Sequence, residues 1–345
     1  MNNKSITVYD IAKEAGVSPA TVSRVLTSNA KVSEEKKKRV QDIIDKYDFE
    51  PNWLARSLSK QETNTIGMLV PDIRNPFYST LFVECELVAA RYGYNMILCN
   101  TINELSAEGI HLKNLVEKRV EAIIQVGGSV DEVNPDSEYI KLVNKISKKV
   151  PIIIAGELEG VDANVYRITP TLNHGMEELL HYLLEKGHRK IALLGGRDTV
   201  IPTKRKRIAM EEILNKHGIQ FIKEFIIDSE YSIEGGYQVV EELLKLNELP
   251  TAIIAINDMA ATGMIKALNR NGIRVPEDIS IIGYDDTFFS EISTPKLTSM
   301  SYNLVYYAET IMETIRNIIQ NKEVERLQYI PTTLEVRDSV KNILE

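Results

Sequence analysis

The residues VYDIAKEAGVSPATVSRVL (8–26) predict two short helices joined by a tight turn. Apolar side chains recur along residues 8–15 with the spacing of one helical face. Gly16 is suited to the left-handed conformation that ends a helix, and Ser18 followed by Pro19 is a favoured start for the next one. Helix, turn and helix at this spacing are typical of a helix-turn-helix unit.

A third helix is expected to complete this unit. Ser33 stands at its predicted start, and an apolar face follows, made by Val40, Ile43, Ile44 and Tyr47. The second helix is short and begins with small side chains, so it can enter a DNA major groove, which is about 12 Å wide. We therefore expect the N-terminal part of the chain to form an all-α DNA-binding headpiece.

The charge of the chain is unevenly distributed. The 345 residues carry 41 Lys and Arg against 49 Asp and Glu, a formal net charge of −8. Residues 1–60 account for +3, which leaves −11 on the rest. The acidic average argues against a nucleic-acid partner, whereas the asymmetry suggests a small module for a polyanion attached to a larger acidic body.

Cysteine usage and hydropathy indicate the compartment. The two cysteines, Cys85 and Cys99, cannot form a disulfide framework, which favours a reducing environment. No apolar run approaches the ~20 residues that span a bilayer, and residues 1–7 lack the apolar core of a secretory signal. We therefore expect a cytoplasmic protein without a membrane partner.

From Asn64 onward, short apolar runs alternate with helical patterns. The runs comprise residues 66–70, 95–98, 122–126, 151–155, 190–194, 251–256 and 279–282. This alternation is typical of βαβ units whose parallel sheets are covered on both faces. About ten strands exceed one comfortable open sheet, so we expect an α/β body of two Rossmann-like lobes.

Residues 8–26 resemble, in type and spacing, the N-terminal signature of the LacI/GalR family of bacterial transcriptional regulators. The resemblance continues through Val32-Ser33 and into PNWLARSL (51–58), the family's hinge helix. It implies a periplasmic-binding-protein-like body behind the headpiece. The implied domain boundaries are 1–50 for the DNA-binding domain, 51–63 for the hinge and linker, and 64–345 for the effector-binding and dimerisation domain. Within this last domain, lobe one is expected to comprise about 64–162 and 300–323, and lobe two about 163–297 and 324–345.

The resemblance also implies which headpiece residues meet DNA. Arg24 is expected to read a base, because a guanidinium pairs bidentately with guanine O6 and N7. Pro19 and Ala20 can contact only apolar groups such as a thymine methyl. The residues expected to contact phosphates and set the register are Thr7, Tyr9, Ser18, Thr21 and Ser23. Thr21 and Ser23 have the alternative of facing solvent.

In the hinge, three residues are assigned by the same resemblance. Asn52 is expected to cap the hinge helix, and Ala55 to let two such helices approach each other. Leu58 is expected to insert as an apolar wedge into the minor groove, where unstacking costs a few kcal/mol and is offset by a bent, better-contacted duplex. Domain packing is the alternative role for Leu58.

Ligands of open α/β sheets bind at the carboxyl ends of the strands. Six residues are expected to bind the effector: Phe77, Tyr78, Arg207, Tyr231, Asn257 and Asp285. By the resemblance, Phe77 and Tyr78 match an Asn-Pro-Phe-aromatic element, Arg207 belongs to an Arg-x-Arg element, Tyr231 aligns with an aromatic that stacks on ligand, and Asp285 is the effector-contacting acid. An Arg, an Asn and a carboxylate beside aromatic faces suit a polyhydroxylated ligand. Core packing for Phe77 and Tyr78, and helix capping for Asp285, remain alternatives.

The sequence thus predicts an allosteric homodimeric repressor that binds double-stranded operator DNA and responds to a sugar or glycoside. Departures from the family pattern at Met210-Glu211 and Arg167–Pro170 leave the effector open. A purine-like corepressor, a phosphorylated carrier protein, and a sugar-binding protein without DNA function remain alternatives, and an inducer is not distinguished from a corepressor. No catalytic constellation, cofactor motif or metal-ligand spacing was found, so no enzyme, cofactor or metal is expected.

Overall fold

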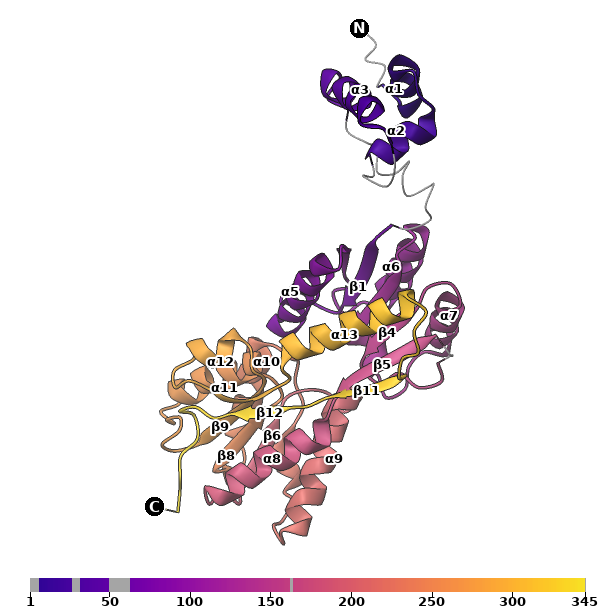
Figure 1. The fold of residues 1–345 in the computed structure, drawn as a ribbon. Helices are drawn as coiled ribbons and strands as arrows, with labels where there is room; N and C mark the ends of the chain where they lie inside the picture. The colour runs from indigo at the N-terminus through magenta and orange to yellow at the C-terminus, as the bar shows by residue number, and fades with distance from the viewer. Residues whose placement is uncertain (1–5, 27–31, 50–62, 162–163, 345) are drawn as a thin grey trace. The chain divides into compact units, whose positions relative to one another are not determined.

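The computed structural model describes residues 6–26, 32–49, 63–161 and 164–344 (Figure 1). Backbone contacts divide the chain into two units, Met1–Thr63 and Asn64–Glu345. None of the helices in the described residues is both long and apolar enough to cross a membrane.

The described part of the N-terminal unit contains three helices, α1 (Val8–Ala15), α2 (Pro19–Leu26) and α3 (Glu34–Lys46). Thr7 and Asp10 form a capping box at the start of α1, and Gly16 ends it with φ of 65°. Ser18 Oγ accepts a hydrogen bond from the Thr21 backbone N–H at 3.2 Å, so the predicted start of α2 is confirmed. All three helices contribute to one small core, formed by Ile11, Ala12, Ala15, Val22, Val25 and Val40.

The described part of the larger unit contains two six-stranded sheets. The first has the order β11-β5-β4-β3-β1-β2, with β1 (Thr65–Val70), β2 (Asn95–Asn100), β3 (Ala122–Val126), β4 (Ile152–Ala155), β5 (Val165–Pro170) and β11 (Leu327–Ile330). The second has the order β12-β10-β9-β8-β6-β7, with β6 (Ile191–Leu194), β7 (Ile226–Ile227), β8 (Ala252–Ala255), β9 (Ser280–Asp285), β10 (Thr298–Ser301) and β12 (Thr333–Glu335). Neighbouring strands pair in parallel, except that β12 runs antiparallel to β10.

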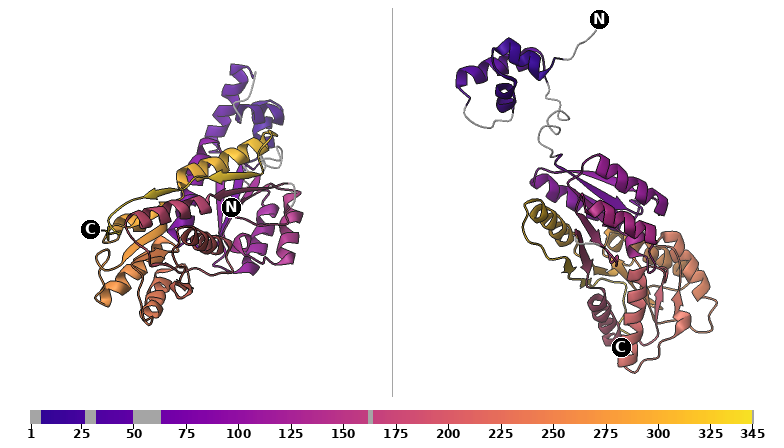
Figure 2. Two further views of the ribbon diagram at one scale, coloured as in Figure 1. Left: turned by 90° about the horizontal axis from the view of Figure 1, so that it is seen from below. Right: turned by 90° about the vertical axis from the view of Figure 1, so that its right-hand side faces the viewer.

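Helices cover both faces of each sheet, as expected for buried parallel strands (Figures 1 and 2). Around the first sheet lie α5 (Pro76–Arg91), α6 (Leu105–Glu117), η1 (Gly128–Asp131), α7 (Ser137–Ser147) and α13 (Leu304–Ile319). Around the second lie α8 (Leu172–Glu185), α9 (Ile201–Lys216), η2 (Lys223–Phe225), α10 (Ile233–Leu243), α11 (Asp258–Arg270) and α12 (Phe288–Ile292). The predicted architecture, a helical headpiece with a two-lobed α/β body, is confirmed.

The chain crosses between the sheets at places that differ from the expected lobe boundaries. β5 and β11 pair with each other in the first sheet, although both ranges were assigned to lobe two. β10 stays in the second sheet, so that crossing lies just after residue 301. The physical reason is that β5 mixes buried with half-buried side chains and contains Arg167 and Thr169, so it lacks the continuous apolar run that marks the central strands.

Helices α10 and α11 pack with almost no space between their backbones. A Cβ at Gly263 would collide with the carbonyl oxygen of Ile233, and one at Gly236 with the carbonyl oxygen of Ala260. We expect Gly263→Ala to lower the free energy of unfolding by about 1–3 kcal/mol, because the helices must move apart. Thermal and urea unfolding would measure this loss.

Gly109→Ala in α6 is the matched control, since its Cβ would only touch Leu142 at 3.4 Å. Replacing a helical glycine without a clash should leave stability unchanged or raise it by up to about 1 kcal/mol. An equal loss in both variants would contradict the close-packing argument.

His188 holds the C-terminal segment against lobe two. Its ring is completely buried, and Nε2 donates to the Lys341 carbonyl oxygen at 3.0 Å while Nδ1 lies 3.0 Å from Thr251 Oγ1. Burial lowers the pKa of His188 below its ordinary 6.5. As the pH falls below about 6.5, the unfolded chain takes up a proton that the folded chain refuses, so we expect the melting temperature to drop.

His188→Gln removes this titration while keeping a donor and an acceptor. The variant should be less stable at neutral pH and should lose part of the decline in melting temperature between pH 6.5 and 5. The same pH dependence in both proteins would show that His188 does not contribute to it.

Candidate functional site

The outward face of α2 is exposed and carries small and polar side chains. Ser18, Pro19, Ala20, Ser23 and Arg24 are exposed and Thr21 is half-buried. The apolar residues of this helix, Val22 and Val25, are buried in the headpiece core. A short helix anchored from behind, with a polar outer face, is the arrangement that a DNA-reading helix requires.

The remaining predicted DNA contacts have different surroundings. The Tyr9 side chain is 74% exposed. Thr7 is also exposed, but its hydroxyl is within hydrogen-bond distance of the Asp10 carboxylate at 2.6 Å as part of the capping box. The hinge residues Asn52, Ala55 and Leu58 lie outside the described residues.

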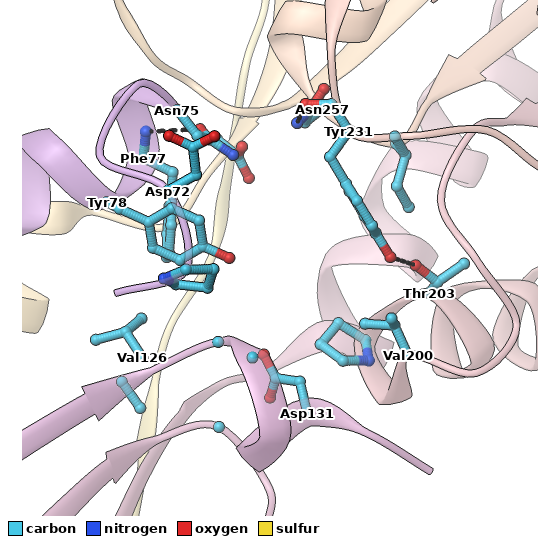
Figure 3. A pocket seen from close by; sticks show the side chains of 18 of the residues that line it. Asp72, Asn75, Phe77, Tyr78, Val126, Asp131, Val200, Thr203, Tyr231 and Asn257 are labelled. Carbon is cyan, nitrogen blue, oxygen red and sulfur yellow. Dashed lines mark hydrogen bonds between the residues drawn. The ribbon is translucent and has the colours of Figure 1, made fainter. Parts of the chain in front are cut away.

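A cavity of about 530 Å³ lies in the larger unit, at the carboxyl ends of strands from both sheets (Figure 3). Five of the six predicted effector residues line it: Phe77, Tyr78, Tyr231, Asn257 and Asp285. Figure 3 shows Tyr78 and Tyr231 on opposite sides of this space. The cavity is large enough for a small ligand. Among the described residues, no group of three or more His, Cys, Asp or Glu could hold a metal ion.

The aromatic side of the cavity follows β1. Asn75 caps α5 by accepting from the Phe77 backbone N–H at 3.0 Å, which places the next two rings at the start of the helix. Phe77 packs edge-on against Tyr78, with ring centroids 5.2 Å apart, and against Tyr302 at 5.7 Å. Both rings therefore pack into the protein and also line the cavity, which combines the two predicted alternatives.

On the opposite side, Tyr231 and Asn257 are held by their own hydrogen bonds. The Tyr231 hydroxyl lies 2.7 Å from Thr203 Oγ1, drawn as a dashed line in Figure 3. Asn257 accepts from the Ala260 backbone N–H at 2.9 Å and donates to the Tyr231 carbonyl oxygen at 3.2 Å. The Tyr231 ring is thus positioned as a rigid face, and Asn257 keeps one amide hydrogen for a ligand.

Asp285 ends β9 and shares the cavity with Lys206, which the sequence analysis did not identify. The Lys206 ammonium lies over the Tyr284 ring at 3.4 Å and donates to the Ile256 carbonyl oxygen at 3.3 Å. Burial lowers the pKa of Lys206, and Asp285 opposes the shift. Burial raises the pKa of Asp285, and Lys206 opposes that shift in turn. The pair presents opposite charges in a desolvated site.

Arg207 does not reach the cavity, contrary to the prediction. Its guanidinium donates to the carbonyl oxygens of Gly195 and Gly196 at 3.3 and 3.4 Å and pairs with Asp228 at 2.7 Å. These acceptors draw the side chain away from the face of α9 that carries Thr203 and Lys206, and those two residues line the cavity instead. Their separation of three residues, one helical turn, is the only sequence signal that could have indicated this face.

Asp258 supports the site from behind. Asp258 is only 1% exposed. Its Oδ2 accepts hydrogen bonds from the Thr287 backbone N–H at 2.6 Å and from the Thr287 hydroxyl at 3.0 Å. Its Oδ1 accepts a hydrogen bond from Ser299 Oγ at 2.6 Å. These bonds tie α11 to the loop that follows Asp285. Asp258 is therefore a positioning residue, since its carboxylate oxygens are occupied by protein donors.

The two lobes touch beside the cavity. The Val133 backbone N–H donates to the Thr199 carbonyl oxygen at 2.8 Å, and Glu157 of lobe one forms an ion pair with Arg205 of lobe two. A ligand that changes these contacts would change the orientation of one lobe relative to the other. Through such a change, a ligand in a cavity between two lobes can alter a binding surface elsewhere in the protein.

Comparisons with known proteins agree with this arrangement. Residues 7–52 match the lacI family of bacterial regulatory proteins, and residues 180–340 match the periplasmic binding protein-like domain. The catabolite control protein A of Priestia megaterium is 31% identical over 339 residues, which cover 98% of this chain and 100% of that protein. The chain belongs to the LacI family. The LacI-family resemblance seen in residues 8–26 is therefore confirmed.

Further LacI-family relatives cover both parts of the chain. The HTH-type transcriptional regulator RegA of Clostridium saccharobutylicum is 32% identical over 326 residues, covering 94% of this chain and 95% of that protein. The structure of the lac repressor dimer bound to operator and the anti-inducer ONPF aligns with a TM-score of 0.87 at 25% identity, covering 98% of this chain and 100% of that one. This LacI-family chain is accordingly a DNA-binding transcriptional regulator.

Proposed function

We propose that this regulator is a dimeric repressor of carbohydrate-utilisation genes whose operator affinity is controlled by a small hydroxyl-rich ligand. The observation that carries the proposal is the cavity, whose lining combines the charged side chains of Asp285 and Lys206 with the aromatic side chains of Tyr78 and Tyr231. Charged acceptors and donors recognise hydroxyl groups, and aromatic faces cover the apolar C–H surface of a sugar ring.

The ligand class has support from a relative. A LacI-family regulator from Enterococcus faecium was solved with bound ribose, and it aligns with a TM-score of 0.70 at 27% identity, covering 81% of this chain and 99% of that one. For the present chain the proposed ligand-contacting residues are Phe77, Tyr78, Lys206, Tyr231, Asn257 and Asp285.

The DNA side of the proposal assigns residues 1–50 to operator binding, 51–63 to the hinge and 64–345 to ligand binding and dimerisation. Arg24 reads a base, while Pro19 and Ala20 contact apolar groups of the bases. Thr7, Tyr9, Ser18, Thr21 and Ser23 contact phosphates, and Asn52, Ala55 and Leu58 act in the hinge.

The dimer has a candidate surface on lobe one. Helices α5 and α13 pack against each other and expose four large apolar side chains, Val83, Leu87, Val305 and Tyr306. Adjacent exposed apolar residues of this size are typical of an interaction surface. The lac repressor, which aligns with 98% of this chain, was solved as a dimer bound to operator.

A thermal-shift screen of sugars, sugar phosphates and purines on the full chain tests the ligand class, because a ligand of the native state raises the melting temperature. We expect sugars or glycosides to give the shifts, and a reporter gene behind the operator to respond to the same compounds. Shifts by purines alone would overturn the sugar assignment, and an unresponsive reporter would overturn repression.

A further inference from the structure

The described lining of the cavity contains more acids than bases, with seven carboxylates against three cationic side chains. Two of the three cations have acidic neighbours in the same lining: Arg74 pairs with Asp72 at 2.6 Å, and Lys206 lies beside Asp285. The third, Arg197, is exposed. The surplus of negative charge is therefore not neutralised by the lining itself.

The surplus of negative charge is concentrated on the part of the lining contributed by lobe one, here called the wall, which contains Asp131 and Glu157. Asp131 follows β3 and Glu157 follows β4, and the Glu157 backbone N–H donates to the Val130 carbonyl oxygen at 3.3 Å. Asp131 Oδ1 lies 2.5 Å from the place where a Cβ of Gly156 would stand. The absence of a side chain at Gly156 is thus what lets Asp131 lie directly beside residue 157.

Each of these two carboxylates has an unsatisfied oxygen. Asp131 Oδ1 and Glu157 Oε1 are shielded from solvent and have no hydrogen-bond partner in the described part of the chain. The Glu157 side chain is only 8% exposed, and its other oxygen pairs with Arg205. Arg205 and Arg167 both favour the charged form of Glu157, whereas burial and negative neighbours dominate the surroundings of half-buried Asp131. A shielded carboxylate without a cationic partner is costly.

The electrostatics of the wall agree with this geometry. Burial raises the pKa of Asp131 to about 7, and the negative charges of Glu157, Glu132 and Glu108 act in the same direction. Burial also raises the pKa of Glu157, although Arg205 opposes that shift. Figure 3 shows Asp131 at the bottom of the cavity, below Tyr78 and Tyr231. The negative charge of Asp131 contributes to the raised pKa of both tyrosines. Acidic groups among aromatic faces are the surroundings that a cationic group prefers.

We propose that the effector carries a protonated amine that docks against Asp131 and Glu157, as an amino sugar would. The inference rests on the proposed function, because it assigns a chemical class to the ligand of the same cavity. Hydroxyl groups of a neutral sugar could donate to these two side chains where they line the cavity, but they would leave the surplus charge uncompensated. A phosphorylated sugar would bring further negative charge to this wall, so the geometry disfavours it.

Calorimetric titration of the full chain tests the inference with glucosamine, galactosamine and mannosamine. Each amine is compared with its parent hexose and with its N-acetyl derivative, which keeps the ring and removes the charge. We expect at least one amine to bind at least tenfold more tightly than both of its neutral counterparts. Equal affinities within every set, or no binding by any amine at millimolar concentration, would overturn the inference.

Two variants test whether a preference for the amine depends on Asp131. Asp131→Asn should remove the preference for the amine, whereas Glu234→Gln, which neutralises an exposed acid elsewhere in the lining, should retain it. Asp131→Asn should also raise the melting temperature of the ligand-free protein, because it removes a half-buried acid whose ionised form is disfavoured by burial and by three acidic neighbours. A lower melting temperature, or an unchanged amine preference in this variant, would contradict the role given to Asp131.

The inference and the proposed function fail in different ways. A neutral sugar that binds tightly and alters operator affinity would overturn the amine while supporting the ligand-controlled regulator. An amine that binds tightly without altering operator affinity would support the wall and contradict the proposed control of DNA binding.

Discussion

Arg24→Ala should weaken binding of the dimer to its operator by at least about 30-fold while changing binding to a scrambled duplex only slightly. A bidentate contact between arginine and guanine contributes about 1–3 kcal/mol of discrimination, and a dimer makes it twice. Arg24 lies on the exposed face of α2, whereas Val22 and Val25 anchor that helix in the core, so the headpiece should remain folded. Fluorescence anisotropy with both duplexes measures the two affinities.

Arg39→Ala on α3 is the matched control, because it removes the same exposed guanidinium from another helix. Its loss should affect operator and scrambled duplex alike and by less than tenfold, as expected for a long-range electrostatic contribution. If Arg24→Ala also weakened both duplexes equally, Arg24 would contribute charge rather than base recognition.

Asp285→Asn should lower ligand affinity by about 10- to 150-fold and leave operator binding without ligand unchanged, so that the regulator no longer responds. A hydrogen bond to a charged group contributes about 1.5–3 kcal/mol, and the neutral amide would also leave Lys206 without its nearest counter-charge. Asparagine tolerates the left-handed backbone that Asp285 adopts, with φ of 92°. Calorimetry with the ligand identified by the thermal-shift screen measures the change.

Asp286→Asn provides the control from the next position in the chain. Asp286 also has a positive φ, but it pairs with Arg337 at 2.9 Å and is absent from the described cavity lining. It should affect stability and leave ligand affinity within about threefold of the original. Equal losses of affinity in both variants would show that the loop, rather than the Asp285 carboxylate, is responsible.

The end of α1 and the start of α2 were predictable because their signals are local, whereas Ser33 begins α3 without the expected side-chain cap. Gly16 ends α1 and Ser18 begins α2 through contacts with residues no more than five positions away. The central strands of the body were predictable for a similar reason, since burial on both faces demands a continuous apolar run. β5 and β11 carry no such run, and their places follow only from pairing between distant segments.

The cavity was predictable where the position of a residue relative to a strand decides its surroundings. Asn257 follows β8 and Asp285 ends β9, and these two strands pair in parallel, so their meeting at one edge of the sheet follows from the topology. Tyr231, which lies after the two-residue strand β7, was assigned only by the family resemblance. The choice between Arg207 and Lys206 depends on acceptors from other segments, such as Asp228, which no local pattern reveals. The same holds for Asp131 and Glu157, which are brought together from the ends of two different strands.

In the proposed function, one chain binds operator DNA and changes that affinity when its cavity is filled. The most direct measurement is a fluorescence-anisotropy titration of a symmetric operator at several salt concentrations, with and without the ligand found by the thermal-shift screen. We predict salt-sensitive binding whose affinity changes at least tenfold with ligand. No salt-sensitive binding in either state, or an operator affinity unaffected by a ligand that fills the cavity, would contradict the account.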